Sequence, residues 1–215
     1  MKRLLNTKNL SMTCHHLHID KSNTINKKIL NISQVHMKDK WYLMRDIKEK
    51  YTVKNLKKRM LKTTTNLVKQ GCVNMRSFID VDSIIKFKAL EAALEVKEHW
   101  RKKNVNLQIG TQLLEGLESK ENLILFNEAS KEVDFIGCLP SRDKCQKTHL
   151  DIVFTKAKEL NKPVEAHLDQ CNIPTEKETE LFCDYVEKYN YQGKARTVHS
   201  ISLACHPLEY QNKIA

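Results

Sequence analysis

The chain has 215 residues, of which 40% are hydrophobic, and it carries a net charge of +11. This length is enough for one sizeable hydrophobic core, and five glycines and four prolines are too few for a fibrous or low-complexity chain. No apolar run approaches the ~18 residues that a membrane span needs, so we expect no membrane association.

The seven cysteines are dispersed without a C-x-x-C pair, and no apolar stretch typical of a signal peptide follows the first residues. We therefore expect reduced thiols and a cytoplasmic location. Most of the positive charge comes from lysine, and the lysine-rich stretch 54–59 could contact phosphates. Because the lysines are spread along the chain with few aromatic residues among them, we favour a solvated surface over nucleic acid binding.

The elements are predicted from the periodicity of apolar residues and from turn signals. Residues 1–9 form a polar N-terminal segment, and residues 10–215 are expected to form one domain. Strands are predicted at 10–19, 72–82, 105–109, 133–139, 163–169 and 196–200. Helices are predicted at 41–70, 86–103, 119–130, 149–160 and 175–189, with a long loop at 22–40 and a helical tail from residue 203.

Strand and helix thus alternate, which indicates βαβ units and a parallel sheet in an α/β fold. The chain contains neither G-x-G-x-x-G nor G-x-x-x-x-G-K-[ST], which argues against dinucleotide-binding and P-loop folds. A TIM (β/α)8 barrel fits better, but eight units need ~250 residues. We therefore predict an incomplete TIM barrel of about six βα units.

Histidines stand at the ends of three predicted strands. His16 and His18 are two residues apart, so on a strand both rings point to the same face. His167 ends the fifth strand and His199 ends the sixth. The carboxyl ends of barrel strands form the active face, and imidazole is a common ligand of zinc and iron. The four histidines therefore predict a metal centre, although a single core histidine usually has a structural role.

Several motifs occur in the order in which one enzyme family has them. They are His16-Leu-His18-Ile-Asp20, Arg76-Ser-Phe-Ile-Asp80-Val-Asp82, Asp134-Phe-Ile-Gly137-Cys-Leu-Pro140, Glu165-Ala-His167-Leu-Asp169 and Val198-His199-Ser200. With these motifs the chain resembles the amidohydrolase superfamily of metal-dependent hydrolases, and specifically its cytosine deaminase-like branch.

The resemblance implies hydrolytic deamination of a small cyclic amidine, such as a pyrimidine-like ring, by a metal-activated water. It implies one divalent metal ion, zinc or iron, with His16, His18 and His167 as ligands. His199 would face the activated water and the substrate.

Four further positions follow from the same resemblance. Gln170 stands where the family has the glutamate that transfers the proton, and the loss of such a group typically costs ~10²–10⁴-fold in rate. Leu114 stands where the family has a substrate-binding glutamine. Asp20 and Asp80 would support the ligands from a second shell, with purely structural roles as the alternative.

The resemblance also predicts that parts are missing. No residue corresponds to the family's aspartate ligand on strand eight, and six strands leave open parallel edges. One hypothesis is an active hydrolase in which self-association or a second chain covers these edges. The other is a truncated, catalytically inactive remnant or an interaction protein.

Overall fold

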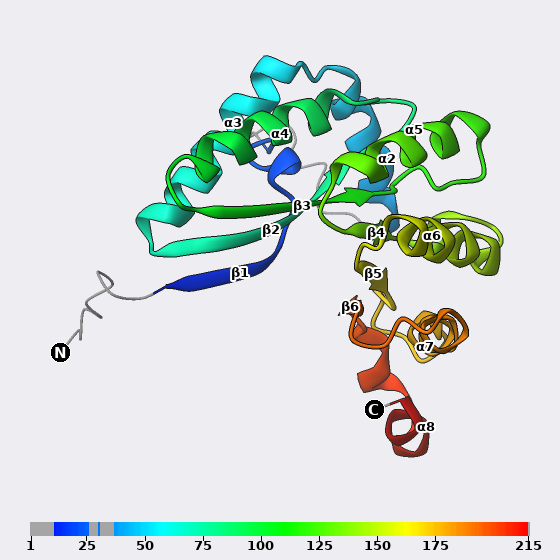
Figure 1. The fold of residues 1–215 in the computed structure, drawn as a ribbon. Helices are drawn as coiled ribbons and strands as arrows, with labels where there is room; N and C mark the ends of the chain where they lie inside the picture. Colours follow the sequence, from blue (N-terminus) through cyan, green and yellow to red (C-terminus); the bar gives the residue numbers. More distant parts are fainter. Residues whose placement is uncertain (1–10, 26–29, 31–36, 215) are drawn as a thin grey trace. The chain divides into compact units, whose positions relative to one another are not determined.

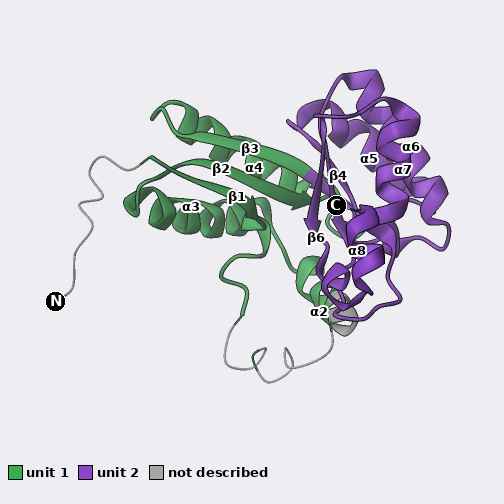
Figure 2. Ribbon diagram, turned by 90° about the horizontal axis from the view of Figure 1, so that it is seen from below, with its two compact units in different colours: residues 1–80, 84–110 green, residues 81–83, 111–215 purple. Residues whose placement is uncertain are grey.

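A computed structural model describes residues 11–25, 30 and 37–214 of the chain. In these residues six strands alternate with helices (Figure 1). None of the helices within these ranges combines the length and the apolar character that a membrane crossing requires. The chain divides into two compact units, residues 1–80 with 84–110 and residues 81–83 with 111–215 (Figure 2).

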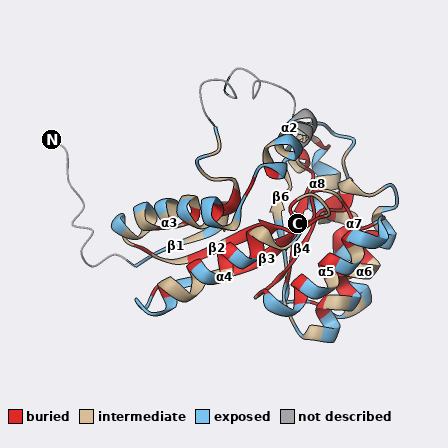
Figure 3. Cartoon of the chain, turned by 90° about the horizontal axis from the view of Figure 1, so that it is seen from above, coloured by how far each residue is buried: buried red, intermediate tan, exposed pale blue. Residues whose placement is uncertain are grey.

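The first unit contains a three-stranded sheet in the order β1–β2–β3. Its strands are β1 (Met12–Leu17), β2 (Cys72–Asp80) and β3 (Asn106–Gln112). β1 and β2 are parallel, and their pairing is irregular between Cys14 and Leu17, just where the histidines lie. Figure 3 shows the buried stretch along β2, which is expected of a parallel strand covered on both faces.

Three helices accompany this sheet, namely α2 (Met37–Glu49), α3 (Val53–Lys69) and α4 (Lys88–Arg101). α3 buries Leu56, Met60 and Thr64 at helical spacing and packs on α4. The indole Nε1 of Trp100 in α4 donates a hydrogen bond to the Thr64 hydroxyl at 2.7 Å. This bond satisfies the buried indole N–H, while the Thr64 hydroxyl itself donates to the Met60 carbonyl at 2.8 Å.

The single helix predicted at 41–70 was wrong, because α2 and α3 are separate helices. Thr52 has extended backbone (φ −118°, ψ 152°), and its side chain accepts the Asn55 N–H at 3.2 Å, so it begins a new helix. Tyr51 is buried beneath the Arg59 guanidinium, 4.4 Å from the ring centroid. The loop predicted at 22–40 was wrong at its end, where α2 begins at Met37; residues 26–29 and 31–36 lie outside the described residues.

The second unit contains a parallel sheet in the order β4–β5–β6. Its strands are β4 (Ile136–Cys138), β5 (Val164–Leu168) and β6 (Ala195–His199). Its helices are α5 (Lys120–Glu132), α6 (Gln146–Leu160), α7 (Glu178–Tyr189) and α8 (Leu208–Ile214), with short 3₁₀ turns at η3 (Pro140–Arg142) and η4 (Ile201–Cys205).

Burial differs sharply between neighbouring strands of this second sheet. All five residues of β5 are buried, whereas β6, the end strand of the sheet, has only half-buried and exposed residues. α6 and α7 pack through an aromatic cluster in which the Phe154 ring lies 5.4 Å from the rings of Phe182 and Tyr189. The core of this unit therefore lies between β5 and the helices.

The observed alternation and the parallel pairs confirm the predicted α/β class. The seven cysteines carry free thiols in this structure, and the reduced state of the protein stays a prediction. A single domain over residues 10–215 and a cytoplasmic location stay predictions.

The side-chain cap at the start of α3 can be tested by mutation. Thr52→Ala removes the side chain that accepts the Asn55 N–H, so we expect the free energy of unfolding to fall by about 1 kcal/mol in urea denaturation. Thr65→Ala, a change within the same helix, should be neutral or stabilise by up to about 0.5 kcal/mol. Equal stability of the Thr52 variant and the wild type would show that the cap is dispensable.

Candidate functional site

Two histidines lie side by side in the first unit. His16 is in β1 and His18 directly follows that strand, so alternation of side chains along extended backbone places both rings on one face. Their Nε2 atoms are 3.2 Å apart. Two nitrogens that bind one zinc ion tetrahedrally at 2.0–2.1 Å are separated by about 3.3 Å. The pair therefore has the spacing of two ligands to one ion.

Phe78 of β2 supports this histidine pair. Its ring is stacked on His18 at a centroid distance of 5.5 Å, and it lies 5.2 Å from the His16 ring at an angle of 55°. Phe78 itself is completely buried. The sequence analysis did not assign it to the site. Its place two residues before Asp80 on the same strand is the signal that could have found it, since residues i and i+2 share a face.

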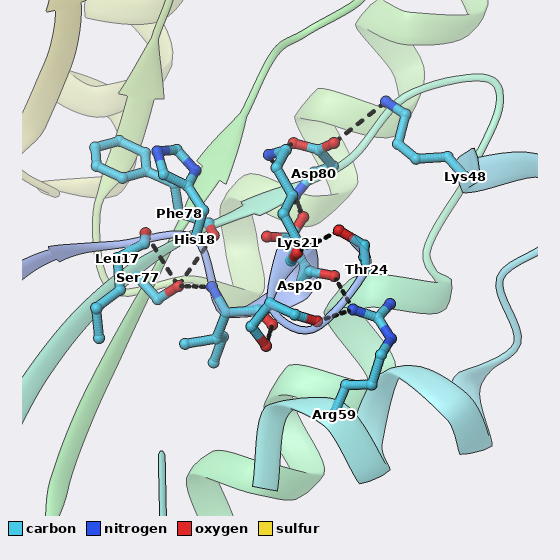
Figure 4. A network of polar contacts seen from close by, with 12 residues as sticks. Leu17, His18, Asp20, Lys21, Thr24, Lys48, Arg59, Ser77, Phe78 and Asp80 are labelled. Atoms are coloured by element: carbon cyan, nitrogen blue, oxygen red, sulfur yellow. Dashed lines mark hydrogen bonds and ion pairs between the residues drawn. The ribbon is translucent and has the colours of Figure 1, made fainter. Parts of the chain in front are cut away.

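Asp20 and Asp80 form a buried ionic network beside this pair (Figure 4). The Asp80 N–H donates to Asp20 Oδ2 at 3.1 Å, which joins the turn after β1 to the end of β2. Asp80 accepts a hydrogen bond from Lys21 at 2.6 Å and forms an ion pair with Lys48 of α2 at 3.2 Å. The sequence analysis did not identify Lys48, which carries no local signal of its role.

Charge keeps Asp80 ionised in this buried place. Burial raises the pKa of a carboxyl, but the ammonium groups of Lys21 and Lys48 outweigh that effect and hold the pKa of Asp80 below its ordinary value. For Asp20, burial raises the pKa above the ordinary value although Lys21 opposes the shift. Through these contacts both aspartates hold the turn that follows His18, and their supporting role at a metal site stays a prediction.

Hydrogen bonds from Ser77 and Arg59 also hold the turn that follows β1. The Ser77 hydroxyl donates to the Leu17 carbonyl at 3.2 Å and accepts the Ile19 N–H at 3.1 Å (Figure 4). The Arg59 guanidinium donates to the backbone carbonyls of Asp20 and Ser22 at 2.8 and 2.6 Å. These contacts restrict the backbone on both sides of His18.

The second unit holds the other two predicted histidines. His167, in β5, is 2% exposed, and His199 ends the neighbouring strand β6. Their ring centroids are 5.2 Å apart. Desolvation lowers the pKa of His199, which favours the neutral imidazole that can accept a hydrogen bond or bind a metal.

Left-handed backbone marks the ends of both strands. Asp169, His199 and Ser200 have φ values of 48°, 75° and 52°, a region that non-glycine residues rarely adopt. Such backbone persists only where surrounding contacts hold it, and it is concentrated at functional sites. Here the N–H groups of Ser200 and Ile201 donate to the carbonyls of Leu168 and Asp169, at 3.0 and 2.9 Å.

The segment that carries Gln170 is tied to the start of α7. The buried Asp169 carboxylate accepts the N–H groups of Glu178 and Thr179 at 2.8 and 3.1 Å, and the Glu178 carboxylate accepts the Asp169 N–H at 3.0 Å. Asp169 is therefore engaged with the helix N-terminus. Gln170, the next residue, is half-buried.

Leu114 belongs to the segment between β3 and α5, which the segment after β4 holds in place. Leu114 is 5% exposed, and its carbonyl accepts a hydrogen bond from the Arg142 guanidinium. The Asp143 carboxylate accepts the Leu117 N–H at 2.9 Å and a hydrogen bond from His149 Nδ1 at 2.6 Å. Gly116 has φ 68°, and a Cβ there would lie 2.0 Å from Asp143 Oδ1, so only glycine permits this approach.

No protein-family model matches the chain. An uncharacterized protein of Haemophilus influenzae is 30% identical over 204 residues, which cover 93% of this chain and 74% of that protein. N-isopropylammelide isopropyl amidohydrolase of Pseudomonas sp. strain ADP is 24% identical over 163 residues, which cover 74% of this chain and 40% of that enzyme.

The fold is similar to that of a solved deaminase. The crystal structure of 5-methylcytosine deaminase from Klebsiella pneumoniae, liganded with phosphonocytosine, matches 93% of this chain with a TM-score of 0.84 at 22% identity. The match covers 49% of the deaminase, so this chain spans about half the length of that enzyme. The likeness confirms the predicted incomplete barrel.

The buried ion pair of the first unit can be tested by removing one partner. Lys48→Met keeps the volume but leaves the fully buried Asp80 with Lys21 as its remaining cation, so we expect a loss of about 3 kcal/mol in unfolding free energy. Lys57→Met, which breaks the exposed pair with Glu95, should cost less than about 1 kcal/mol. Equal losses in the two variants would contradict the assigned importance of Asp80.

Asp143 predicts a pH dependence of stability. Burial raises the pKa of this carboxyl, but hydrogen bonds from His149 and from the Leu117 N–H lower it below the ordinary value. Its contribution is therefore complete above the unfolded-state pKa of about 3.9 and disappears as the pH falls through the lower folded-state pKa.

We expect Asp143→Asn to lower the free energy of unfolding by about 1–3 kcal/mol at neutral pH. On acidification, the free energy of unfolding of this variant should fall less than that of the wild type. Urea unfolding at several pH values measures both effects. Asp184→Asn, at an exposed position of α7, should stay within about 0.5 kcal/mol of the wild type. Parallel pH profiles for the wild type and the Asp143 variant would exclude this role.

Proposed function

We propose that this chain is a metal-dependent hydrolase of the amidohydrolase superfamily, in its cytosine deaminase-like branch; the relative by sequence and the solved structures described above support this proposal. The reaction would be hydrolytic deamination at the C–N bond of a pyrimidine-like ring or another cyclic amidine. The 5-methylcytosine deaminase described above has a similar fold, and its crystal structures contain phosphonocytosine or 5-fluorocytosine.

The spacing of His16 and His18 carries this proposal. Their Nε2 atoms, 3.2 Å apart, fit two ligands of one divalent ion, and imidazole nitrogen is a ligand of both zinc and iron. We assign His167 as the third ligand and His199 as the residue that faces the substrate, following the family order of these motifs. A metal ion held by these imidazoles would lower the pKa of a bound water to near 7 and so supply a nucleophile.

The remaining side chains orient the substrate. A neutral His199 can accept or donate a hydrogen bond at the leaving amine. The Gln170 amide can hold a ring nitrogen or a water by hydrogen bonds, but it cannot take up and release a proton near neutral pH. Leu114 offers the ring an apolar contact in place of an amide. We therefore expect turnover to be ~10²–10⁴-fold below that of an enzyme with a carboxylate at position 170.

Gln170 also favours a second candidate function. A chain that binds metal but turns over no substrate would be an inactive relative that acts through binding. β6 is an end strand of its sheet, and its residues are half-buried or exposed. An end strand can pair with a further strand. For both the active and the inactive function we therefore propose a partner that covers this edge, either a second copy of the chain or another chain.

Metal content and ammonia release test the proposal together. Purified wild-type protein loaded with zinc or iron should hold about one ion per chain, and His16→Asn or His18→Asn should lower this occupancy at least ~10-fold. His15→Asn is the matched control, because His15 is exposed and alternation points it away from the pair. A wild type that binds no more metal than the His16 variant would refute the proposal.

Activity then separates the two candidates. Gln170→Glu restores a side chain that can transfer a proton, so ammonia release from cytosine should rise ~10²-fold or more if the chain is a deaminase. Metal binding without ammonia release from any pyrimidine, in both the wild type and this variant, would instead support the inactive, binding function.

A further inference from the structure

Four lysines line one face of α3. Lys54, Lys58, Lys62 and Lys69 are all exposed, and at 3.6 residues per turn they lie within an arc of about 80° around the helix axis. We call them the lysine stripe. With a rise of 1.5 Å per residue, the stripe is about 22 Å long. Figure 3 shows the exposed turns along α3.

The stripe faces away from the core of its unit. The buried residues Leu56, Met60 and Thr64 lie on the opposite side of α3, which packs on η2 (Ile19–Lys21), β2 and α4. α3 also contains no aspartate or glutamate from its first residue to its last. The positive charge of this face is therefore not balanced within the helix.

Five other exposed lysines are paired with carboxylates, namely Lys57 with Glu95, Lys102 with Glu98, Lys131 with Glu128, Lys188 with Asp151 and Lys213 with Glu180. Within the described part of the chain, no ion pair involves a lysine of the stripe. In the same part of the chain Lys50, Lys86, Lys120 and Lys147 are also exposed without an ion pair, but they are scattered over separate elements. The stripe differs by its alignment, since it places four unpaired positive charges on one helix face, and such a face attracts a polyanion.

We propose that the lysine stripe binds the phosphodiester backbone of a nucleic acid without reading its sequence. A strand of DNA carries one phosphate per 3.4 Å of helix axis, so a straight row of cations ~22 Å long can face about six phosphates of one strand. The first three lysines are four residues apart and Lys69 lies seven residues further on, so all four charges fall along this one line. Two amide side chains, Asn66 and Gln70, are exposed at the C-terminal end of α3. They can donate hydrogen bonds to phosphate and sugar oxygens.

The structure favours nucleic acid over an anionic membrane. A helix that binds the membrane surface inserts large apolar side chains between its basic residues. The exposed large hydrophobic residues of the described chain are Met12, Ile25, Leu30, Ile124, Ile173, Ile201 and Leu208, and none of them belongs to α3.

This binding surface is independent of the histidine site and of the proposed reaction. The sequence favoured a solvated surface, because the lysines are spread along the chain with few aromatic residues among them. The alignment of four lysines without ion pairs on one face of α3 is the observation that reverses this interpretation for α3.

Fluorescence anisotropy with a labelled DNA duplex and a single RNA strand of the same length tests the proposal. If all four lysines contact phosphates, the slope of log K against log salt should be about −3.6 for the duplex and about −2.8 for the single strand. Duplex affinity should then fall about 100-fold between 50 and 200 mM salt. The tighter of the two probes identifies the kind of nucleic acid.

The quadruple variant Lys54→Gln, Lys58→Gln, Lys62→Gln, Lys69→Gln should bind at least ~30-fold more weakly at 50 mM salt, with an unchanged unfolding midpoint. A control changes four paired lysines to glutamine and so removes the same net charge, at Lys102, Lys131, Lys188 and Lys213. It should keep most of the affinity.

Three results would overturn the proposal. One is the absence of binding to either probe at 50 mM salt. Another is an equal loss of affinity in the control variant, which would mean that binding depends only on the total charge of the protein. The third is tighter binding to phosphatidylserine vesicles than to both nucleic acids, with the same sensitivity to the stripe, which would assign this face to membranes.

Discussion

The Asp80 carboxylate at the end of β2 is the charge on which the first unit depends. An unpaired carboxylate at this depth would cost several kcal/mol, and two ammonium groups, from the turn after β1 and from α2, offset that cost. Lys21 lies three residues after His18, so the contact that satisfies Asp80 also fixes the turn beside the histidine pair. The position of a candidate ligand and the stability of its surroundings therefore depend on the same ion pairs.

In the second unit, carboxylates are stabilised mainly by backbone N–H groups and not by ammonium groups. Asp169 accepts two N–H groups at the start of α7, and Asp143 accepts the N–H of Leu117 together with a histidine proton. Each carboxylate thereby holds one segment that follows a strand, and those segments carry Gln170 and Leu114. The supports of the candidate site are thus made of short, directional hydrogen bonds, which restrict backbone more tightly than apolar contacts do.

In the proposed function, metal binding and turnover are separable. His16 and His18 have the spacing that a ligand pair requires, whereas the position proposed to transfer the proton holds an amide. A non-ionisable Gln170 would leave binding of a small cyclic molecule intact while slowing the proposed chemistry. The match to the solved deaminase covers 49% of that enzyme.

The sequence by itself determined the order of strands and helices and the histidines at the strand ends. These features are local, since apolar periodicity and the two-residue repeat of a strand are read from neighbouring positions. Positions 114 and 170 were singled out by the family resemblance alone, and their roles stay predictions. It missed the break at Tyr51 and Thr52, because the periodicity continues across it and only burial of Tyr51 and the Thr52 cap interrupt the helix. The tertiary structure alone decided that Lys48 meets Asp80, that His149 meets Asp143 and that the four lysines of the stripe on α3 form no ion pair, whereas Lys57 of the same helix pairs with Glu95. Ion pairs form between groups that folding brings within a few ångströms, and separation along the chain does not reveal that distance.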